Sequence, residues 1–138
     1  MKFIVIMMMA LSFCSTVYAA PIGESDATIK LVADPAIENV INGLVTGDYT
    51  LFSTNFTSKL MKSVPVGRFE NEVESLKLGS GKYIRHSYMG FINQASHTIE
   101  FYKAKFDQTA NDVLLYIYLS KADDAVYVTG VRWFAHSF

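Results

Sequence analysis

The chain has 138 residues, of which 51% are hydrophobic, and its 12 lysines and arginines against 13 acidic residues give a formal net charge of −1. Such a balance gives no electrostatic support for nucleic acid or an anionic membrane surface as a partner, because that kind of binding needs clustered cations. The length suits one domain with one hydrophobic core.

Residues 1–19 have the composition of a secretory signal peptide. Lys2 precedes an apolar run that ends at Cys14, and Val17 and Ala19 have the size that a cleavage site requires. The run is shorter than the roughly 20 residues that cross a bilayer. We therefore predict cleavage after Ala19, export to a periplasmic or extracellular location, and no stable membrane span. A lipid anchor on Cys14 is the alternative, although bulky Phe13 precedes it.

Residues 20–33 allow two interpretations, a flexible leader or an extension of the helix that follows. The domain itself is predicted to cover residues 34–138. Since the single cysteine lies in the signal peptide, packing rather than disulfides must stabilise the mature protein.

The first predicted helix has Asp34 as its N-cap and Pro35 at its first position. Its apolar stripe consists of Ile37, Val40, Ile41, Leu44 and Val45. Gly47 is expected to end this helix in a left-handed conformation, and Asp48 is expected to cap the next one.

Two more helices are predicted before the pattern changes. The apolar residues of the second are Tyr49, Phe52, Phe56 and Leu60. The third lies in "PVGRFENEVESLKLGSG", and its apolar side consists of Val66, Phe69, Val73 and Leu76. Gly79, Ser80 and Gly81 are expected to stop it.

After Gly81 the apolar residues alternate, and Tyr, Ile, Phe, Val and Thr become frequent, which is typical of strands. Four strands are predicted, at about 82–93, 97–106, 112–120 and 125–135. The breaks between them are too short for helical crossovers, so the strands should form an antiparallel meander. Helices followed by such a sheet define an α+β domain with the helices on one sheet face.

Pairing Phe106 with Val113 and Leu119 with Val126 divides the side chains between two faces. One face is aliphatic and suits a position beneath the helices. The other collects aromatic side chains, including Tyr116, Tyr118, Tyr127 and Trp133. A slip of one residue would exchange the faces.

This order of elements, with "LVTGDYTLFSTNFTSKLMKSV" and "FENEVESLKLGSGKY", resembles the nuclear transport factor 2-like superfamily, nearest to an uncharacterised group of small secreted bacterial domains. The resemblance implies three N-terminal helices packed on a curved four-stranded antiparallel meander, a cone-shaped, cystatin-like fold. It also implies a pocket between the helices and the concave sheet face. Members use that pocket for isomerase or dehydratase chemistry, for binding or for dimerisation, so the fold does not select a function.

The resemblance carries no catalytic residue over to this chain. Ketosteroid isomerase-like members place a carboxylate base and a tyrosine in the pocket, but no acid here matches that site; Glu100 lies on the second predicted strand, and Asp107 and Asp112 lie in or beside turns. His86 and Tyr102 are the candidates that remain for acid–base chemistry. The histidines lack the short spacings of zinc sites, so no metal or other cofactor is predicted.

The aromatic face is the stronger indication of function. Tyr116, Tyr118, Tyr127 and Trp133 form a candidate ligand or interface surface, because large exposed apolar patches usually mark interfaces. Arg132 can orient an anionic ligand in an apolar pocket, or form an exposed ion pair. Coverage of these aromatics by terminal segments, or a reversed register that buries them, is the structural alternative.

Three functional hypotheses follow. The first is an exported, non-catalytic domain that binds a small apolar ligand or an envelope protein. The second is an isomerase- or dehydratase-type enzyme that uses a pocket histidine or tyrosine. The third is a homodimeric structural or interaction module.

Overall fold

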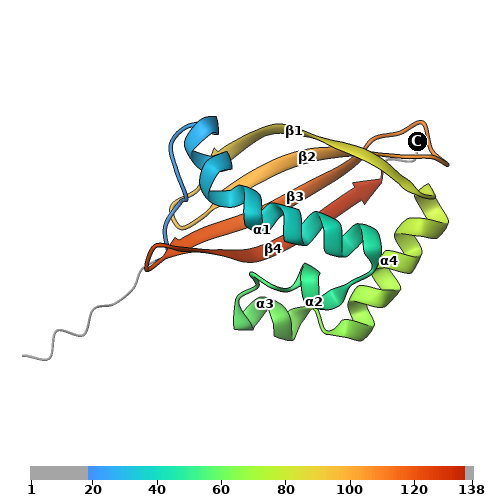
Figure 1. The fold of residues 1–138 in the computed structure, drawn as a ribbon, viewed down its shortest axis with the longest axis horizontal. Helices are drawn as coiled ribbons and strands as arrows, with labels where there is room; N and C mark the ends of the chain where they lie inside the picture. The colour runs from blue at the N-terminus through green and yellow to red at the C-terminus, as the bar shows by residue number, and fades with distance from the viewer. Residues whose placement is uncertain (1–18, 136–138) are drawn as a thin grey trace, which may run out of the picture.

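A computed structural model describes residues 19–135, so the predicted signal sequence up to residue 18 lies outside the described residues, as does His136. Helices come first and a four-stranded antiparallel sheet follows, which confirms the α+β class (Figure 1). The helices are α1 (Asp26–Thr46), α2 (Tyr49–Phe52), α3 (Ser58–Ser63) and α4 (Val66–Ser80). The strands are β1 (Tyr83–Asn93), β2 (Thr98–Phe106), β3 (Val113–Ala122) and β4 (Ala125–Ala135), in that order across the sheet.

The first helix is longer than predicted. α1 begins after Ser25, whose side chain accepts a hydrogen bond from a backbone N–H of the first turn, so Asp34 is not the N-cap and Pro35 lies inside the helix. Proline removes one helical hydrogen bond. The carbonyl that loses its donor belongs to Leu31, which is exposed, so water can replace the missing partner. Helix extension is therefore the correct interpretation for residues 26–33.

The preceding segment, residues 20–25, is attached to the sheet. Ala20 and Lys121 exchange two backbone hydrogen bonds, of 3.1 and 2.8 Å. Ile22 is buried, and its N–H donates to Thr98 Oγ1 over 3.0 Å. These contacts attach this part of the chain to β2 and β3.

The predicted caps of the middle helices are present, with one difference. Gly47 has a φ of 71° and ends α1, and the Asp48 side chain accepts from the N–H of Leu51 at 3.0 Å. Gly79, by contrast, lies within α4, and Gly81 with a φ of 85° is the residue that ends that helix. Only the latter glycine adopts a conformation that other residues avoid.

The single helix predicted from Tyr49 to Leu60 is wrong, because contacts with β4 interrupt it. Phe56 forms a short parallel bridge with Val128. The N–H of Val128 donates to the Asn55 carbonyl over 2.7 Å, and the N–H of Thr57 donates to the Val128 carbonyl over 3.1 Å. This pairing with a distant strand divides the segment into α2 and α3, so four helices rather than three precede β1.

The pairing of β2 with β3, and of β3 with the start of β4, keeps the predicted faces, although two partners differ. Val113 pairs with Ala104 rather than with Phe106, and Leu119 pairs with Val128. Each pair is displaced by two residues from the prediction. A displacement of two leaves each side chain on the same face, because side chains alternate with period two.

In the second half of β4 the side chains lie on the opposite faces from those predicted. A register shift beside Tyr118 inserts an extra residue into β4, which reverses the alternation beyond it. Val131 therefore pairs with Ile117 and Trp133 pairs with Leu115, and both pack against the core. Trp133 lies beneath the helices and not on the aromatic outer face.

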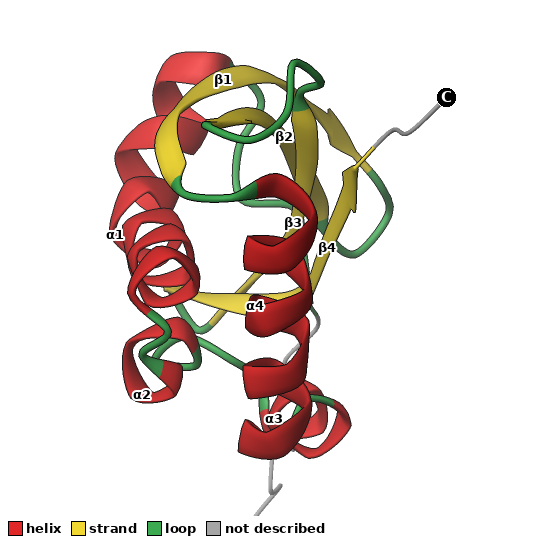
Figure 2. Ribbon diagram, turned by 90° about the vertical axis from the view of Figure 1, so that its right-hand side faces the viewer, coloured by secondary structure: helices red, strands yellow, loops and turns green. Residues whose placement is uncertain are grey.

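The core lies between the helices and one sheet face, here called the inner face. β1 carries two register shifts and bends strongly, as Figure 2 shows. The buried inner-face residues of the two central strands are Thr98, Glu100, Tyr102, Ala104, Phe106, Val113, Leu115, Ile117 and Leu119. α4 contributes Phe69, Val73 and Leu76, as predicted, whereas Val66 is 49% exposed.

Candidate functional site: a cavity between the helices and the sheet

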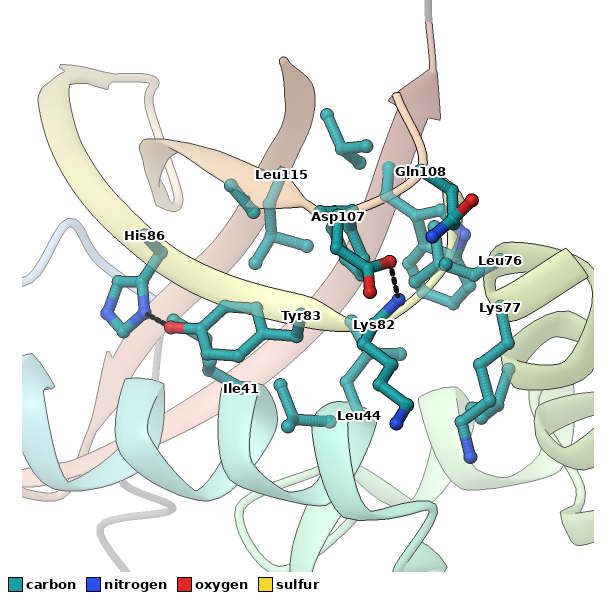
Figure 3. Close-up of a pocket in the computed structure, with 17 residues that line it drawn as sticks. Ile41, Leu44, Leu76, Lys77, Lys82, Tyr83, His86, Asp107, Gln108 and Leu115 are labelled. Atoms are coloured by element: carbon teal, nitrogen blue, oxygen red, sulfur yellow. Dashed lines mark hydrogen bonds between the residues drawn. The ribbon is translucent and has the colours of Figure 1, made fainter. Parts of the chain in front are cut away.

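A cavity of about 650 Å³ lies between α1, α4 and the inner face (Figure 3). Its helical wall is apolar and consists of Ile41, Leu44, Val45, Val73 and Leu76. The opposite wall consists of the strand residues Ala104, Phe106, Val113, Leu115 and Trp133. Cavities that bind small molecules usually measure roughly 300–1,000 Å³ and are mostly apolar, so this one has suitable size and chemistry.

The link between α4 and β1 forms part of the cavity wall. The N–H of Lys82 donates to Asp107 Oδ1 over 2.7 Å, and the N–H of Asp107 donates to the Lys82 carbonyl over 2.9 Å. A third bond runs from the N–H of Gln108 to the Ser80 carbonyl, over 3.1 Å. A Cβ on Gly81 would overlap the side chains of Asp107 and Gln108. Glycine is thus required here for two reasons, the close approach and the positive φ.

Four exposed polar residues mark the mouth of the cavity. Lys77 comes from α4, Lys82 precedes β1, and Asp107 and Gln108 follow β2. In Figure 3 the side chains of both lysines extend in the same direction. Sequence reasoning placed Asp107 in a turn and gave none of the four residues a role, because only the junction at Gly81 brings them together.

The other polar group of the cavity is a histidine–tyrosine pair. His86 Nδ1 and the Tyr83 hydroxyl share a hydrogen bond, and both residues line the cavity (Figure 3). Burial, and then the negative charge of Glu38, raise the pKa of Tyr83. The hydroxyl therefore keeps its proton at neutral pH and can donate it to a neutral imidazole.

The two predicted acid–base candidates have different positions. His86 lines the cavity, whereas Tyr102 is buried beside it, with the two ring centroids 5.8 Å apart. Tyr102 donates from its hydroxyl to Glu100 Oε2 over 3.3 Å, a long hydrogen bond. The second candidate therefore faces a carboxylate in the core and does not line the cavity.

Glu100 is a buried carboxylate that sequence reasoning placed on the strand without assigning it a role. It has no exposed surface, and its Oε1 has no hydrogen-bond partner among residues 19–135. Burial raises the pKa of Glu100 to about 7; Tyr102 and Lys30 oppose this rise, and the negative charge of Asp34 adds to it. The alternation of β2 could have indicated its burial, since Glu100 shares a face with Tyr102 and Ala104.

The five residues predicted as a ligand or interface surface divide between two places. Tyr116, Tyr118, Tyr127 and Arg132 lie on the outer face, which is the sheet face turned away from the helices. Trp133 lines the cavity. Tyr116, Tyr118 and Tyr127 therefore do not share the cavity with Trp133, whereas Arg132 and Trp133 both border a smaller hollow beside α3.

The outer face carries aromatic residues that the prediction did not select. Tyr116 packs between Phe101 and Phe134, with ring centroids 5.1 and 5.6 Å away. The Arg132 guanidinium lies over the Tyr118 ring at 5.9 Å, within cation–π range. This arrangement leaves Arg132 near an aromatic ring and away from the lining of the cavity.

Residues 19–135 contain no group of three or more side chains that could together hold a metal ion. Over the same range, no helix has the length and apolar character needed to cross a membrane. Comparisons of the chain with protein-family models, curated proteins and solved structures give no match.

Replacement of Gly81 tests the junction that forms part of the cavity wall. We expect Gly81→Ala to lower the free energy of unfolding by about 1–3 kcal/mol, because alanine is strained at this φ and its Cβ overlaps Asp107. Gly79→Ala is the matched control; its Cβ meets nothing within 4 Å, and alanine should stabilise the helix by about 0.5–1 kcal/mol. Equal urea midpoints for the two variants would contradict this account.

Burial of Glu100 predicts a loss of stability as pH rises. The folded-state pKa of about 7 exceeds the ordinary 4.5, so the folded protein binds this proton more tightly than the unfolded chain. The resulting stability is complete below about pH 4.5 and is lost as pH rises to about 7. The unfolding free energy lost across this pH range should be on the order of 3 kcal/mol.

Urea unfolding at several pH values measures this effect. Glu100→Gln should not lose stability with rising pH in this way. The unfolding free energy of the parent should therefore fall relative to that of the variant between about pH 4.5 and pH 7. Glu74→Gln, at an exposed position of α4, should reproduce the parent profile. A Glu100→Gln profile parallel to that of the parent would exclude Glu100 as the titrating group.

Proposed function

We propose that this chain is an exported, non-catalytic domain that binds a small apolar molecule in the cavity between α1, α4 and the sheet. The observation that carries the proposal is the cavity itself, about 650 Å³ in volume and enclosed mainly by aliphatic and aromatic side chains. Removal of such a molecule from water stabilises the complex by roughly 0.8 kcal/mol for each buried methylene.

The cavity supports binding better than catalysis. Its lining contains one carboxylate, Asp107, and one oxygen of that carboxylate accepts the backbone N–H of Lys82. Glu100 and Tyr102 lie outside the lining. An isomerase- or dehydratase-type reaction would have to rely on His86 and Tyr83, whose mutual hydrogen bond engages the Tyr83 hydroxyl and His86 Nδ1.

Export by the predicted signal peptide and membership of the nuclear transport factor 2-like superfamily are parts of this proposal. Support for the second comes from the order of the elements, with helices before an antiparallel meander and a cavity between the two layers. An apolar ligand of the periplasm or the extracellular medium would suit both.

The single tryptophan allows binding to be measured directly, because Trp133 lines the cavity. We expect the neutral apolar dye N-phenylnaphthylamine to quench Trp133 fluorescence with a saturable curve. Ala104→Leu places extra methyl groups in the cavity and should weaken binding about tenfold or more, since space for two or more methylenes is lost.

Ser75→Leu is the control for this experiment, because it adds the same side chain at an exposed position of α4 that does not line the cavity. It should bind the dye as the parent does. Unchanged affinity in Ala104→Leu, with the variant folded by circular dichroism, would place the dye elsewhere.

A second candidate function is interaction with another protein, including a second copy of this chain, through the outer face. The observation in its favour is the cluster of Phe101, Tyr116 and Phe134, of which Phe134 is 48% exposed. Aromatic residues are enriched at interfaces. Arg132 and Tyr118 continue this surface along the sheet.

Sedimentation of a charged variant tests self-association through this face. If the outer face is a dimer interface, the parent should sediment as a dimer and Tyr116→Glu as a monomer, because a carboxylate would be buried without a partner. Leu31→Glu, at an α1 position that is 81% exposed, should leave the mass unchanged. A parent that is already monomeric would remove the dimer from consideration.

A further inference from the structure

Charge is distributed unevenly around the cavity. Two cations, Lys77 and Lys82, lie among the exposed residues of its mouth. The three ion pairs found in residues 19–135 involve neither of them. Since the lining beyond the mouth is mostly aliphatic and aromatic, the site combines a cationic entrance with an apolar interior.

From this combination we propose that the occupant is a single-chain amphiphile with an anionic head group. The head group lies between Lys77 and Lys82, and the hydrocarbon chain lies in the cavity. The inference rests on the proposed binding function and names the class of ligand.

The two lysines suit a shared anion because they come from different elements. Lys77 lies in the last turn of α4, and Lys82 lies just beyond Gly81. In Figure 3 both side chains extend in the same direction at the edge of the cavity. The position of Lys77 also suits the negative end of the helix dipole. That local effect does not account for Lys82, which is outside the helix.

The acidic residue of the mouth offsets only one of the two lysine charges. Asp107 Oδ1 accepts the backbone N–H of Lys82 over 2.7 Å, and among residues 19–135 its carboxylate forms no ion pair with either lysine. The ammonium groups of Lys77 and Lys82 therefore remain available to a ligand within the described structure.

The other polar pair of the lining lies away from the ends of the lysine side chains. Tyr83 and His86 share a hydrogen bond with each other (Figure 3). Lys77 and Lys82 are the lysines of the lining, so they attract a negatively charged head group and orient the ligand.

The apolar lining of the cavity predicts how the affinity depends on the length of the ligand's hydrocarbon chain. The space beyond the lysines is bordered by Leu44, Leu76, Ala104 and Leu115, which offer a hydrocarbon chain no polar partner. Each methylene that enters should tighten binding about fourfold, until the cavity is filled. Longer chains should then gain nothing.

Quenching or enhancement of Trp133 fluorescence in the full mature chain measures these affinities. Straight-chain carboxylates of increasing length are compared with alcohols and amines of the same length, at low and high salt. We expect the carboxylate to bind about two- to thirtyfold tighter than the alcohol, the range expected for two partly exposed ion pairs. This preference should shrink at high salt, whereas the gain per methylene should persist.

Three variants test whether the two lysines at the mouth cause the preference for a carboxylate head group. Lys77→Gln and Lys82→Gln should each reduce the carboxylate-to-alcohol affinity ratio, and the double variant should abolish it. Lys62→Gln is the matched control, because Lys62 is also an exposed lysine in the last turn of a helix but does not line the cavity. It should keep the full ratio. An alkyl phosphate series run in parallel distinguishes a phosphate head group from a carboxylate.

The outcomes separate this inference from the function on which it rests. Equal affinity for carboxylate, phosphate, alcohol and amine would overturn the anionic head group and leave apolar binding intact. A preference for the amine, or a ratio unchanged in the double variant, would also overturn it. If no chain of any length or head group binds, the proposed function fails as well.

Discussion

The junction at Gly81 is the constraint on which the cavity depends. At this point the chain turns from α4 into β1, and three hydrogen bonds hold residues 80–82 against the end of β2. A side chain at Gly81 would occupy the space that Asp107 and Gln108 need. Because α4 ends here, the junction also determines where its last turn lies relative to the sheet. The cavity wall, the mouth and the two lysines all follow from one backbone conformation that glycine adopts without strain.

The inner face contains two kinds of environment, and they have different consequences. Beneath α1, Glu100 is buried with one oxygen unpaired, so its ionisation opposes folding. Nearer to α4 the face borders the cavity, which is lined by aliphatic and aromatic side chains. Tyr102 and His86 separate the two, through a hydrogen bond on one side and a ring contact on the other. The unfavourable polar group of the core is thus kept outside the lining of the cavity.

The two sheet faces offer two separate opportunities for recognition. On the inner side, the cavity combines apolar walls with Lys77 and Lys82 at its mouth. On the outer side, aromatic rings pack on one another next to Arg132. A small amphiphile suits the first because it can be withdrawn from water, and a protein surface suits the second because the rings remain partly exposed.

The sequence by itself determined the α+β class, the four strands within one to two residues of their ends, and the caps at Gly47 and Asp48. These features depend on local periodicity and on backbone preferences of single residues, which are legible in one chain. Tertiary contacts decided the rest. Pairing of Phe56 with Val128 divided a helix that its apolar spacing favoured, and an extra residue in β4 moved Trp133 from the outer face into the cavity. Likewise Lys77, Lys82 and Tyr83 became a site only because Gly81 brings a helix end and a strand start to the end of β2. A register shift or a close backbone approach is a relation between distant segments, and no pattern within either segment specifies it.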